Sequence, residues 1–271
     1  MNDFETLKLD CDTRGVLTVT LNLPKKKNAL SAQMISDLTQ LASVVVSDTK
    51  YRVMILRGAG DVFCAGGDLG WMMLQIEGER ECRIAEARKL ANMLRKFNEM
   101  PLPVIGAIHG GAFGGGIGMA CVCDVVIAET GTKFGLTETR LGLIPATISP
   151  YVIARMGEGK ARRVFMSARI FTAKEAKELE IISTYVPLKE MDARIEAEIL
   201  PYLSAAPEAV AASKALARSL GPCIDDAVIE ETIQRLADTW EGDEAREGID
   251  AFLKRAVFSN QLWEKAKVGG C

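Results

Sequence analysis

Short apolar runs alternate with amphipathic stretches along the first half of the chain. The apolar runs cover residues 7–11, 16–22, 51–58, 101–110 and 124–129. The later runs are continuous rather than alternating, which is typical of parallel strands buried on both faces. Asp12 and Gly15 lie between the first two runs and predict a turn that joins them in a hairpin.

Amphipathic segments separate these predicted strands. The segment 31–46 begins with Ser31, a residue that favours a helix N-cap, and keeps its apolar residues on one helical face. The segment 82–99 repeats the helical spacing. The apolar positions of the two segments are Met34, Ile35, Leu38, Leu41 and Ala42, and then Ile84, Ala87, Leu90, Leu94 and Phe97. This alternation of strand and helix favours a parallel, doubly wound α/β sheet.

The second half has a mainly helical pattern. Helices are predicted near 159–168, 172–180, 188–203, 206–219, 224–240 and 243–257, with one short strand near 182–186. We therefore predict an α/β core over residues 1–190 and a helical C-terminal segment over 191–271.

The composition narrows the class of protein. The chain has 271 residues, of which 48% are hydrophobic and 25% charged, as in an ordinary folded protein. Its net charge of −3 argues against a dedicated nucleic-acid binder. The apolar runs are shorter than the roughly 18 residues of a membrane span. The acidic N-terminus has no charged-then-apolar leader, so we expect a cytoplasmic protein.

Cysteine and histidine limit the available chemistry. The chain has seven cysteines and one histidine, His109, and the pair Cys121 and Cys123 has no second cluster to complete a zinc site. We therefore expect buried, reduced thiols, no metal, and a structural role for His109. Acid–base chemistry then falls to carboxylates.

Glycine is concentrated in two segments that follow predicted strands. Six of the nine residues from Gly110 to Gly118 are glycine, although each glycine inside a helix costs about 1 kcal/mol relative to alanine. Close packing explains such glycines, and so does exposure of backbone N–H groups to a ligand oxygen at a helix start. Residues 64–68 form a second bare loop. Ligands bind at the carboxyl ends of parallel strands, where two such loops can form an oxyanion hole. Neither loop matches a dinucleotide or nucleoside-triphosphate fingerprint.

Three ordered motifs resemble one known family. They are F-C-A-G-G-D at 63–68, H-G-G-A-F-G-G-G-I-G-M-A-C-V-C-D at 109–124 and F-G-L-T-E-T-R-L-G-L-I-P at 134–145. Together they resemble the enoyl-CoA hydratase/isomerase (crotonase) superfamily, and the likeness extends to residues 247–255. The resemblance implies an α/β fold with a crotonase-like ββα spiral core, a helical C-terminal trimerisation segment, an acyl-CoA substrate and no cofactor.

The resemblance also implies roles for particular residues. It places the oxyanion-hole amides on Gly67 and Gly115, and the carbonyl that meets the adenine of coenzyme A on Ala65. Lys26 and Lys27 occupy the stretch beside the coenzyme A phosphates. Lys254 matches a lysine that often reaches a neighbouring subunit's coenzyme A. Gly66, Asp68, Trp71 and Gly114 complete the expected substrate-binding set.

The acid–base residues depart from the two-carboxylate pattern of the family's hydratases. The first glutamate position is Gly118, whereas the second is present as Glu138. A single shuttling base suits isomerisation of a 3-enoyl thioester, and it also permits hydration if another group orients the water. The runs 66–72 and 141–152 resemble the branch that hydrates 3-methylglutaconyl-CoA and isohexenylglutaconyl-CoA. We therefore favour hydration of a branched enoyl-CoA, with Δ3,Δ2-enoyl-CoA isomerisation as the alternative.

A third hypothesis is a catalytically weak acyl-CoA-binding or RNA-associated protein that has kept the fold. The missing carboxylate at Gly118 supports it. We further expect Asp68 to cap a helix and Asp124 to form a hydrogen bond with the backbone at the start of its strand. Trp71, Met72 and Met73 either line the acyl pocket or belong to the hydrophobic core. A homotrimer or dimer of trimers is the expected assembly.

Overall fold

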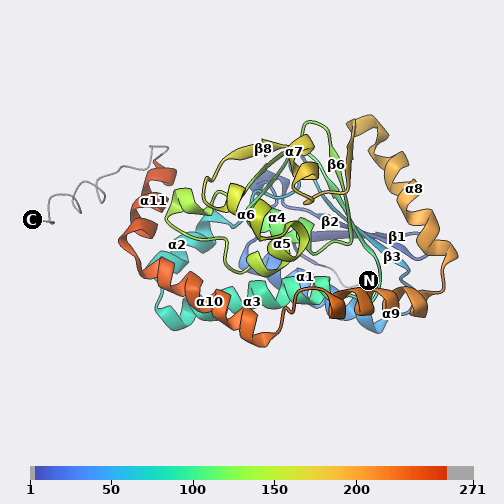
Figure 1. Cartoon of the computed structure of the whole chain (residues 1–271), viewed down its shortest axis with the longest axis horizontal. Coiled ribbons are helices and arrows are strands. Elements are labelled where there is room, and N and C mark those ends of the chain that lie inside the picture. The colour runs from blue at the N-terminus through green and yellow to red at the C-terminus, as the bar shows by residue number, and fades with distance from the viewer. Residues whose placement is uncertain (1–3, 255–271) are drawn as a thin grey trace, which may run out of the picture.

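The computed structural model of the protein describes residues 4–254 and contains two β-sheets enclosed by helices (Figure 1). The larger sheet has the strand order β1-β2-β3-β4-β6-β9, and β1 and β2 pair in the predicted antiparallel hairpin while the other neighbours are parallel. Its strands are β1 (Leu7–Cys11), β2 (Val16–Leu21), β3 (Val53–Gly58), β4 (Val104–Ile108), β6 (Val125–Glu129) and β9 (Thr184–Val186).

The doubly wound arrangement is wrong, although the parallel sheet is confirmed. The strand order runs in one direction and never reverses, so the sheet has no switch point of the doubly wound kind. Instead, β5 (Gly111–Phe113), β7 (Lys133–Gly135) and β8 (Ile170–Thr172) leave the main sheet and form a second, smaller one. An alternating pattern indicates parallel pairing but not strand order, and these three-residue strands are too short to show a hydrophobic period.

Both faces of the large sheet are buried, as the continuous apolar runs predicted. Along β3, Val53 and Ile55 pack on the side of α8 (Met191–Ser204). Met54 and Leu56 face the main core, which also receives α1 (Ala32–Ser47) and the end of α3 (Arg80–Asn98). The Ser31 hydroxyl accepts a hydrogen bond from the Met34 N–H, so the predicted N-cap is confirmed.

The remaining helices are mostly short and lie at the rim of the sheets or in the C-terminal half. They are α2 (Leu69–Glu77), α4 (Gly115–Cys121), α5 (Ser149–Met156), α6 (Glu158–Phe165), α7 (Ala173–Glu178), α9 (Pro207–Leu220), α10 (Asp226–Glu241) and α11 (Asp243–Leu253), with single 3-10 turns η1 (Pro24–Lys26), η2 (Glu138–Leu141) and η3 (Leu188–Glu190). The predicted extension of the last helix to 257 lies outside the described residues.

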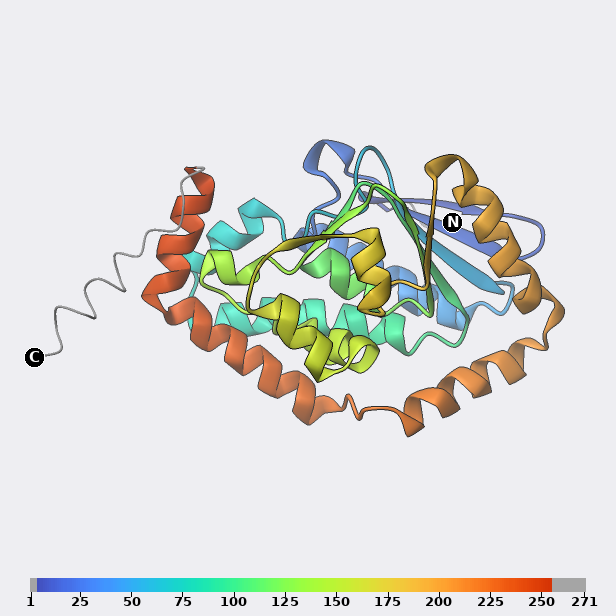
Figure 2. The same cartoon turned by 45° about the horizontal axis from the view of Figure 1, so that its top comes forward.

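Helices α8 to α11 follow one another around the outside of the core (Figure 2). Helix α10 packs along α3, and α11 packs on the turn η2. Their side chains join those of α3 and η2 in a second hydrophobic cluster that includes Ile233, Trp240 and Ile249. The last two described helices therefore contribute to the core of their own chain. The boundary at residue 190 stays a prediction.

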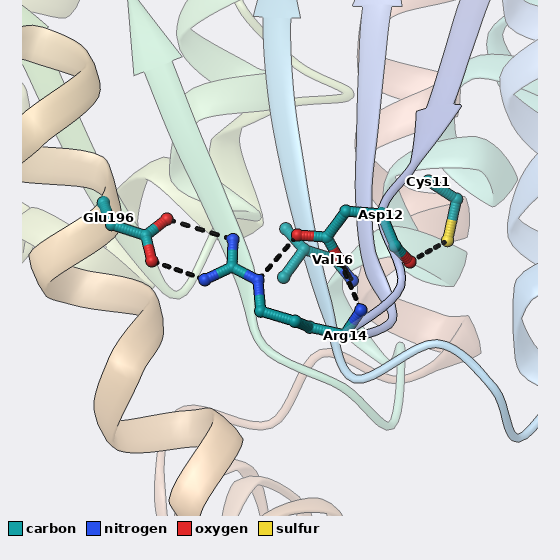
Figure 3. A network of polar contacts seen from close by, with 5 residues as sticks. All are labelled: Cys11, Asp12, Arg14, Val16 and Glu196. Atoms are coloured by element: carbon teal, nitrogen blue, oxygen red, sulfur yellow. Dashed lines mark hydrogen bonds and ion pairs between the residues drawn. The ribbon is translucent and has the colours of Figure 1, made fainter.

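The turn between β1 and β2 is tied to α8 by a small polar network (Figure 3). The Arg14 guanidinium donates to both carboxylate oxygens of Glu196 and, through Nε, to Asp12 at 2.7 Å. Both partners of the Arg14–Glu196 ion pair are more than 40% exposed, so the pair contributes little to the free energy of unfolding. The pair links the hairpin turn to α8, which packs on the sheet through its apolar side chains.

The cysteines only partly follow the expectation. Cys64, Cys121 and Cys123 are buried, and burial raises the pKa of each of these thiols to about 12. The prediction of burial is wrong for Cys82 and Cys223, which are exposed, because each lies on the solvent side of its segment. Cys271 lies outside the described residues. Within residues 4–254, no helix is both long and apolar enough to cross a membrane.

Candidate active site

The two glycine-containing loops are hydrogen-bonded to each other. The Cys64 N–H donates to the Gly111 carbonyl at 3.2 Å, and the Phe113 N–H donates to the Cys64 carbonyl at 3.1 Å. Cys64 and Ala112 thereby form a parallel bridge between the segment after β3 and the strand β5. The loops predicted to converge therefore lie side by side, held by main-chain bonds rather than by side chains.

Glycine is required where these loops touch. Gly66 has a φ of +96°, and a Cβ placed there would lie 3.0 Å from the Phe113 carbonyl oxygen. A Cβ at Gly116 would lie 2.7 Å from the Cys64 carbonyl oxygen. Because both obstacles are main-chain atoms, a side chain at either position would separate the loops. Close packing thus accounts for these two glycines.

Gly67 and Gly115 each have a backbone N–H group that is unpaired within the described residues. The Leu30 N–H donates to the Gly66 carbonyl at 2.7 Å, and its carbonyl accepts from the Asp68 N–H at 3.2 Å. In a parallel bridge of this kind, the middle residue turns its own N–H away from the partner strand. The Gly67 N–H therefore points away from Leu30. Neither this N–H nor that of Gly115 has a hydrogen-bond partner among residues 4–254.

Glu138 begins the turn η2 and lies against the second loop. A Cβ on Gly114, whose φ is +47°, would lie 2.8 Å from Glu138 Oε1, so glycine at 114 allows the carboxyl group to approach. Glu138 Oε2 is buried and has no hydrogen-bond partner within the described chain. Burial raises the pKa of this carboxyl group to about 7, because ionisation would place an uncompensated charge away from water.

Gly67, Gly115 and Glu138 line one cavity with a volume of about 80 Å³. The rest of its wall is mostly apolar and comes from α2, α3, α10, the residues around the start of α1, and the loop after η2. Its other lining residues are Leu30, Ile35, Trp71, Met72, Leu90, Leu143, Ile144, Pro145, Ala146, Thr147, Ile148, Leu236 and Trp240. A buried carboxyl group at the end of an apolar cavity, beside two free N–H groups, is suited to moving a proton next to a polarised carbonyl.

Of the three α2 residues considered for the acyl pocket, Trp71 and Met72 lie over Gly67. A Cβ on Gly67 would be 3.4 Å from the Met72 terminal carbon and 4.0 Å from the Trp71 ring. The Trp71 indole N–H donates to Glu86 at 3.2 Å, which fixes the ring. Met73 is not part of the cavity wall, and it is 36% exposed because it lies on the outer face of α2.

Position 118, where the family's other glutamate would lie, has no room for a side chain. A Cβ on Gly118 would lie 2.4 Å from Ile148 Cγ2 and 2.9 Å from Ile148 Cβ. Ile148 is itself only 2% exposed and lines the cavity. The missing carboxylate is therefore matched by an isoleucine side chain that occupies its space.

The residues expected at coenzyme A lie outside the acyl cavity. Ala65 is half-buried and donates its N–H to the Lys27 carbonyl at 3.0 Å. Lys26 and Lys27 are exposed, and Lys26 Nζ lies 3.8 Å from Asp68. The exposed Lys254 pairs with Asp250 one turn earlier on the C-terminal helix.

Three further predictions, those for Asp68, Asp124 and His109, agree with the structure. The Asp68 carboxylate accepts from the Trp71 N–H and caps α2. Asp124 accepts from the Val104 N–H and pairs with Lys214. His109 Nε2 lies 2.7 Å from the Gly60 carbonyl oxygen, a structural contact. Within the described range, no group of three or more histidine, cysteine or acidic residues is close enough to hold a metal ion.

Reasoning from sequence named only five residues of the cavity wall, Gly67, Trp71, Met72, Gly115 and Glu138, and missed the others. Leu236 and Trp240 reach the cavity from α10, and nothing in their helical spacing distinguishes them from core residues. Thr147 and Ile148 replace part of the glycine-rich run that the family usually has after Ile-Pro. That replacement was the available signal, but only the fold shows that these two side chains enter the site.

The fold and the site together suit one class of protein: an enzyme with a spiral α/β core, in which two loops with unpaired N–H groups and a buried carboxyl group line one cavity. The family model described as enoyl-CoA hydratase/isomerase matches residues 12–261. The chain belongs to this enoyl-CoA hydratase/isomerase family, within the crotonase superfamily.

Individual relatives agree with this assignment. An enoyl-CoA hydratase of Alternaria alternata, AKT6-1, is 32% identical over 98% of this chain and 86% of its own length. The human mitochondrial methylglutaconyl-CoA hydratase is 33% identical over 65% of this chain and 51% of its own length. The solved structure of Pseudomonas aeruginosa AtuE is 34% identical, with a TM-score of 0.77, and the match covers 93% of this chain and 98% of that chain. The resemblance in the three motifs and the expected fold are confirmed.

Proposed function

We propose that this enzyme adds water across the double bond of an α,β-unsaturated acyl-CoA with a branched acyl group. The observation that carries the proposal is the meeting of Gly67, Gly115 and Glu138 on one cavity. The first two offer N–H groups to a thioester oxygen, and the third offers a carboxyl group that exchanges its proton near neutral pH.

The reaction then proceeds through a thioester enolate. As water adds to C3, the double-bond electrons move toward the thioester and the negative charge on its oxygen is stabilised by the two N–H groups. Glu138 takes the proton that water releases and returns a proton to C2, which yields the 3-hydroxyacyl-CoA. This sequence is a water addition with proton transfer, and it uses no metal or redox cofactor.

Coenzyme A binding is assigned to the rim of the cavity. The Ala65 carbonyl has no hydrogen-bond partner within the described chain, so it is free to accept from the adenine amino group. Gly66 keeps the two loops close together, and Gly114 leaves room for the Glu138 carboxyl group beside the second loop. Lys26, Lys27 and Lys254 supply positive charge for the phosphates, since each is solvent-exposed.

Isomerisation of a 3-enoyl-CoA is the second candidate function, and one observation favours it. Position 118 has no carboxylate and no space for one, so Glu138 is the carboxyl group that lines the cavity. One base that removes a proton from C2 and returns it to C4 completes an isomerisation without water. Hydration is preferred because the relatives named above include an enoyl-CoA hydratase and a methylglutaconyl-CoA hydratase.

A screen of purified protein against enoyl thioesters tests the proposal. The panel contains crotonyl-CoA, 3-methylcrotonyl-CoA, 3-methylglutaconyl-CoA and 3-hexenoyl-CoA, and chromatography separates hydrated from isomerised products. We expect 3-hydroxyacyl-CoA products, with higher kcat/KM for the branched thioesters. Isomerised 3-hexenoyl-CoA without any 3-hydroxy product would reverse the choice between the two reactions.

We also propose that the protein assembles as a homotrimer or a dimer of trimers. Helix α9 has no buried residue, although Leu216 and Leu220 are 60% and 80% exposed. A groove of about 1090 Å³ separates α9 from the core. A second copy of the chain covering this helix would bury that apolar surface. Light scattering after size-exclusion chromatography is expected to give three or six times the mass of one chain.

A further inference from the structure

The cavity contains one polar side chain besides Glu138 that has no partner in the described chain, namely the hydroxyl of Thr147. Thr147 is only 6% exposed. The two other buried threonines in residues 4–254 bond within the protein: Thr6 to Asp37 at 2.7 Å, and Thr132 to the Ile108 carbonyl at 3.3 Å. The buried side-chain oxygens without a partner in the described chain are Glu138 Oε2 and the Tyr151 hydroxyl, so the Thr147 hydroxyl oxygen is not itself enclosed. Because Thr147 lines the cavity, its unpaired hydroxyl is available to a water or a ligand atom there.

The neighbouring residue explains why the hydroxyl is needed. Two-carboxylate hydratases have a second acidic group at position 118, but here Ile148 fills the adjoining space and a Cβ on Gly118 would lie 2.4 Å from its Cγ2. The loop that brings in Ile148 also brings Thr147 to the wall of the cavity. The segment that excludes a carboxylate at 118 thus supplies another hydrogen-bonding group.

We propose that Thr147 and Glu138 together hold the water that attacks the substrate. The inference rests on the hydratase function proposed above and deepens it. The water donates one hydrogen bond to the Glu138 carboxylate and the other to Thr147 Oγ1, and a lone pair remains to form the bond to C3. The C2–C3 double bond becomes the enolate, the water proton passes to Glu138, and Glu138 then protonates C2. Thr147 keeps its own proton throughout.

The experiment compares three variants on crotonyl-CoA and 3-methylcrotonyl-CoA. Thr147→Val keeps the shape of the side chain and removes the hydroxyl, so kcat for hydration is expected to fall about 10²-fold, the typical effect of a misplaced reactant. KM is expected to stay unchanged, because Thr147 holds water and not the thioester. Thr147→Ser is expected to recover most of kcat.

Thr232→Val serves as the matched control. It removes a hydroxyl that bonds the Ile229 carbonyl on α10, outside the cavity wall, and is expected to leave both constants unchanged. If thermal melting shows that Thr147→Val is unfolded, Thr147→Ala takes its place. An unchanged kcat in the hydroxyl-free variant, or a raised KM with kcat retained, would overturn the role of Thr147. A wild-type protein that hydrates neither thioester would instead reject the hydratase function itself.

Discussion

The two sides of the cavity are built in different ways. On one side, Gly67 and Gly115 are positioned by main-chain hydrogen bonds and by two isolated bridges, Leu30 with Gly67 and Cys64 with Ala112 of β5. On the other side, Glu138 lies in a 3-10 turn, and its surroundings are side chains of α3, α10, α11 and the loop that contains Thr147 and Ile148. The first side is a backbone wall, made of residues 64–68 and 110–116, and the second is a side-chain wall.

This difference indicates which steps of the proposed reaction can be altered by substituting side chains. In the proposed mechanism, the backbone wall polarises the thioester carbonyl whatever the side chains are, because its donors are peptide N–H groups. The side-chain wall then decides what happens to the activated carbon atoms, and it changes with single residues such as Gly118 and Ile148. Four predictions test this division, beginning with the largest expected effect.

Removing the acid–base group should abolish turnover without affecting the backbone wall. Glu138→Gln keeps the size of the side chain, so we expect kcat to fall by about 10²- to 10⁴-fold, the usual contribution of a general acid–base group. Coenzyme A thioester binding, measured by calorimetry, should be retained. Glu178→Gln, which alters an exposed carboxylate on α7 outside the cavity wall, is the matched control. A Glu138→Gln variant with the turnover of the wild type would support the catalytically weak alternative.

The same group should make stability depend on pH. The folded carboxyl group has a pKa of about 7, whereas its ordinary value is 4.5, so the folded state binds the proton more tightly between these values. The free energy of unfolding is therefore expected to fall as pH rises from about 4.5 to 7, by up to roughly 3 kcal/mol. Above pH 7 this loss is complete.

Denaturant melts of the wild type and Glu138→Gln across this range measure the effect. The variant lacks the titrating group, so its stability relative to the wild type should increase with pH. A constant difference between pH 4.5 and 8 would show that Glu138 has an ordinary pKa. The pH profile of kcat should show an apparent pKa near 7 in the wild type.

Two glycine substitutions separate the walls directly. Gly116→Ala meets the Cys64 carbonyl oxygen, and Gly118→Ala meets the Ile148 side chain. Each is expected to lower the free energy of unfolding by about 1–3 kcal/mol, as overpacking does. In a double-mutant cycle, Ile148→Ala should cost less stability in the Gly118→Ala background than in the wild type, and the same in the Gly116→Ala background as in the wild type. Gly159→Ala is the control, because a Cβ there meets no atom within 4 Å. If Ile148→Ala had the same effect in the Gly116→Ala and Gly118→Ala variants, the distinction between the backbone wall and the side-chain wall would be removed.

The smallest effect is expected at the rim of the cavity. Lys26 is exposed and lies 3.8 Å from Asp68, a pair of little value to stability. Lys26→Ala should therefore leave thermal melting unchanged and raise KM for acyl-CoA a few-fold, with a smaller difference at high salt because screening weakens the attraction to phosphate. A change in kcat rather than KM would place Lys26 closer to the chemistry than proposed.

The sequence by itself determined those features that have a local physical cause. Apolar runs, the Ser31 cap and the Asp12–Gly15 turn predicted the strands, α1 and the hairpin, since each depends on hydrogen bonds or periodicity within a few residues. The glycine loops and Glu138 could also be identified from the sequence. Their residue types and their positions within the three motifs indicate backbone N–H donors and an acid–base carboxyl group.

Only the tertiary structure decided how distant segments meet. Strand order and the second sheet depend on pairing that no local pattern encodes. Trp240 reaches the cavity although it lies more than 100 residues beyond Glu138 in the sequence. Ile148 fills the space beside Gly118 only because the loop that contains Ile148 packs against α4. The pKa of Glu138 likewise depends on burial by the whole surrounding wall. Burial and long-range contacts exist only in the folded chain, so they cannot be inferred from the identity of a single residue.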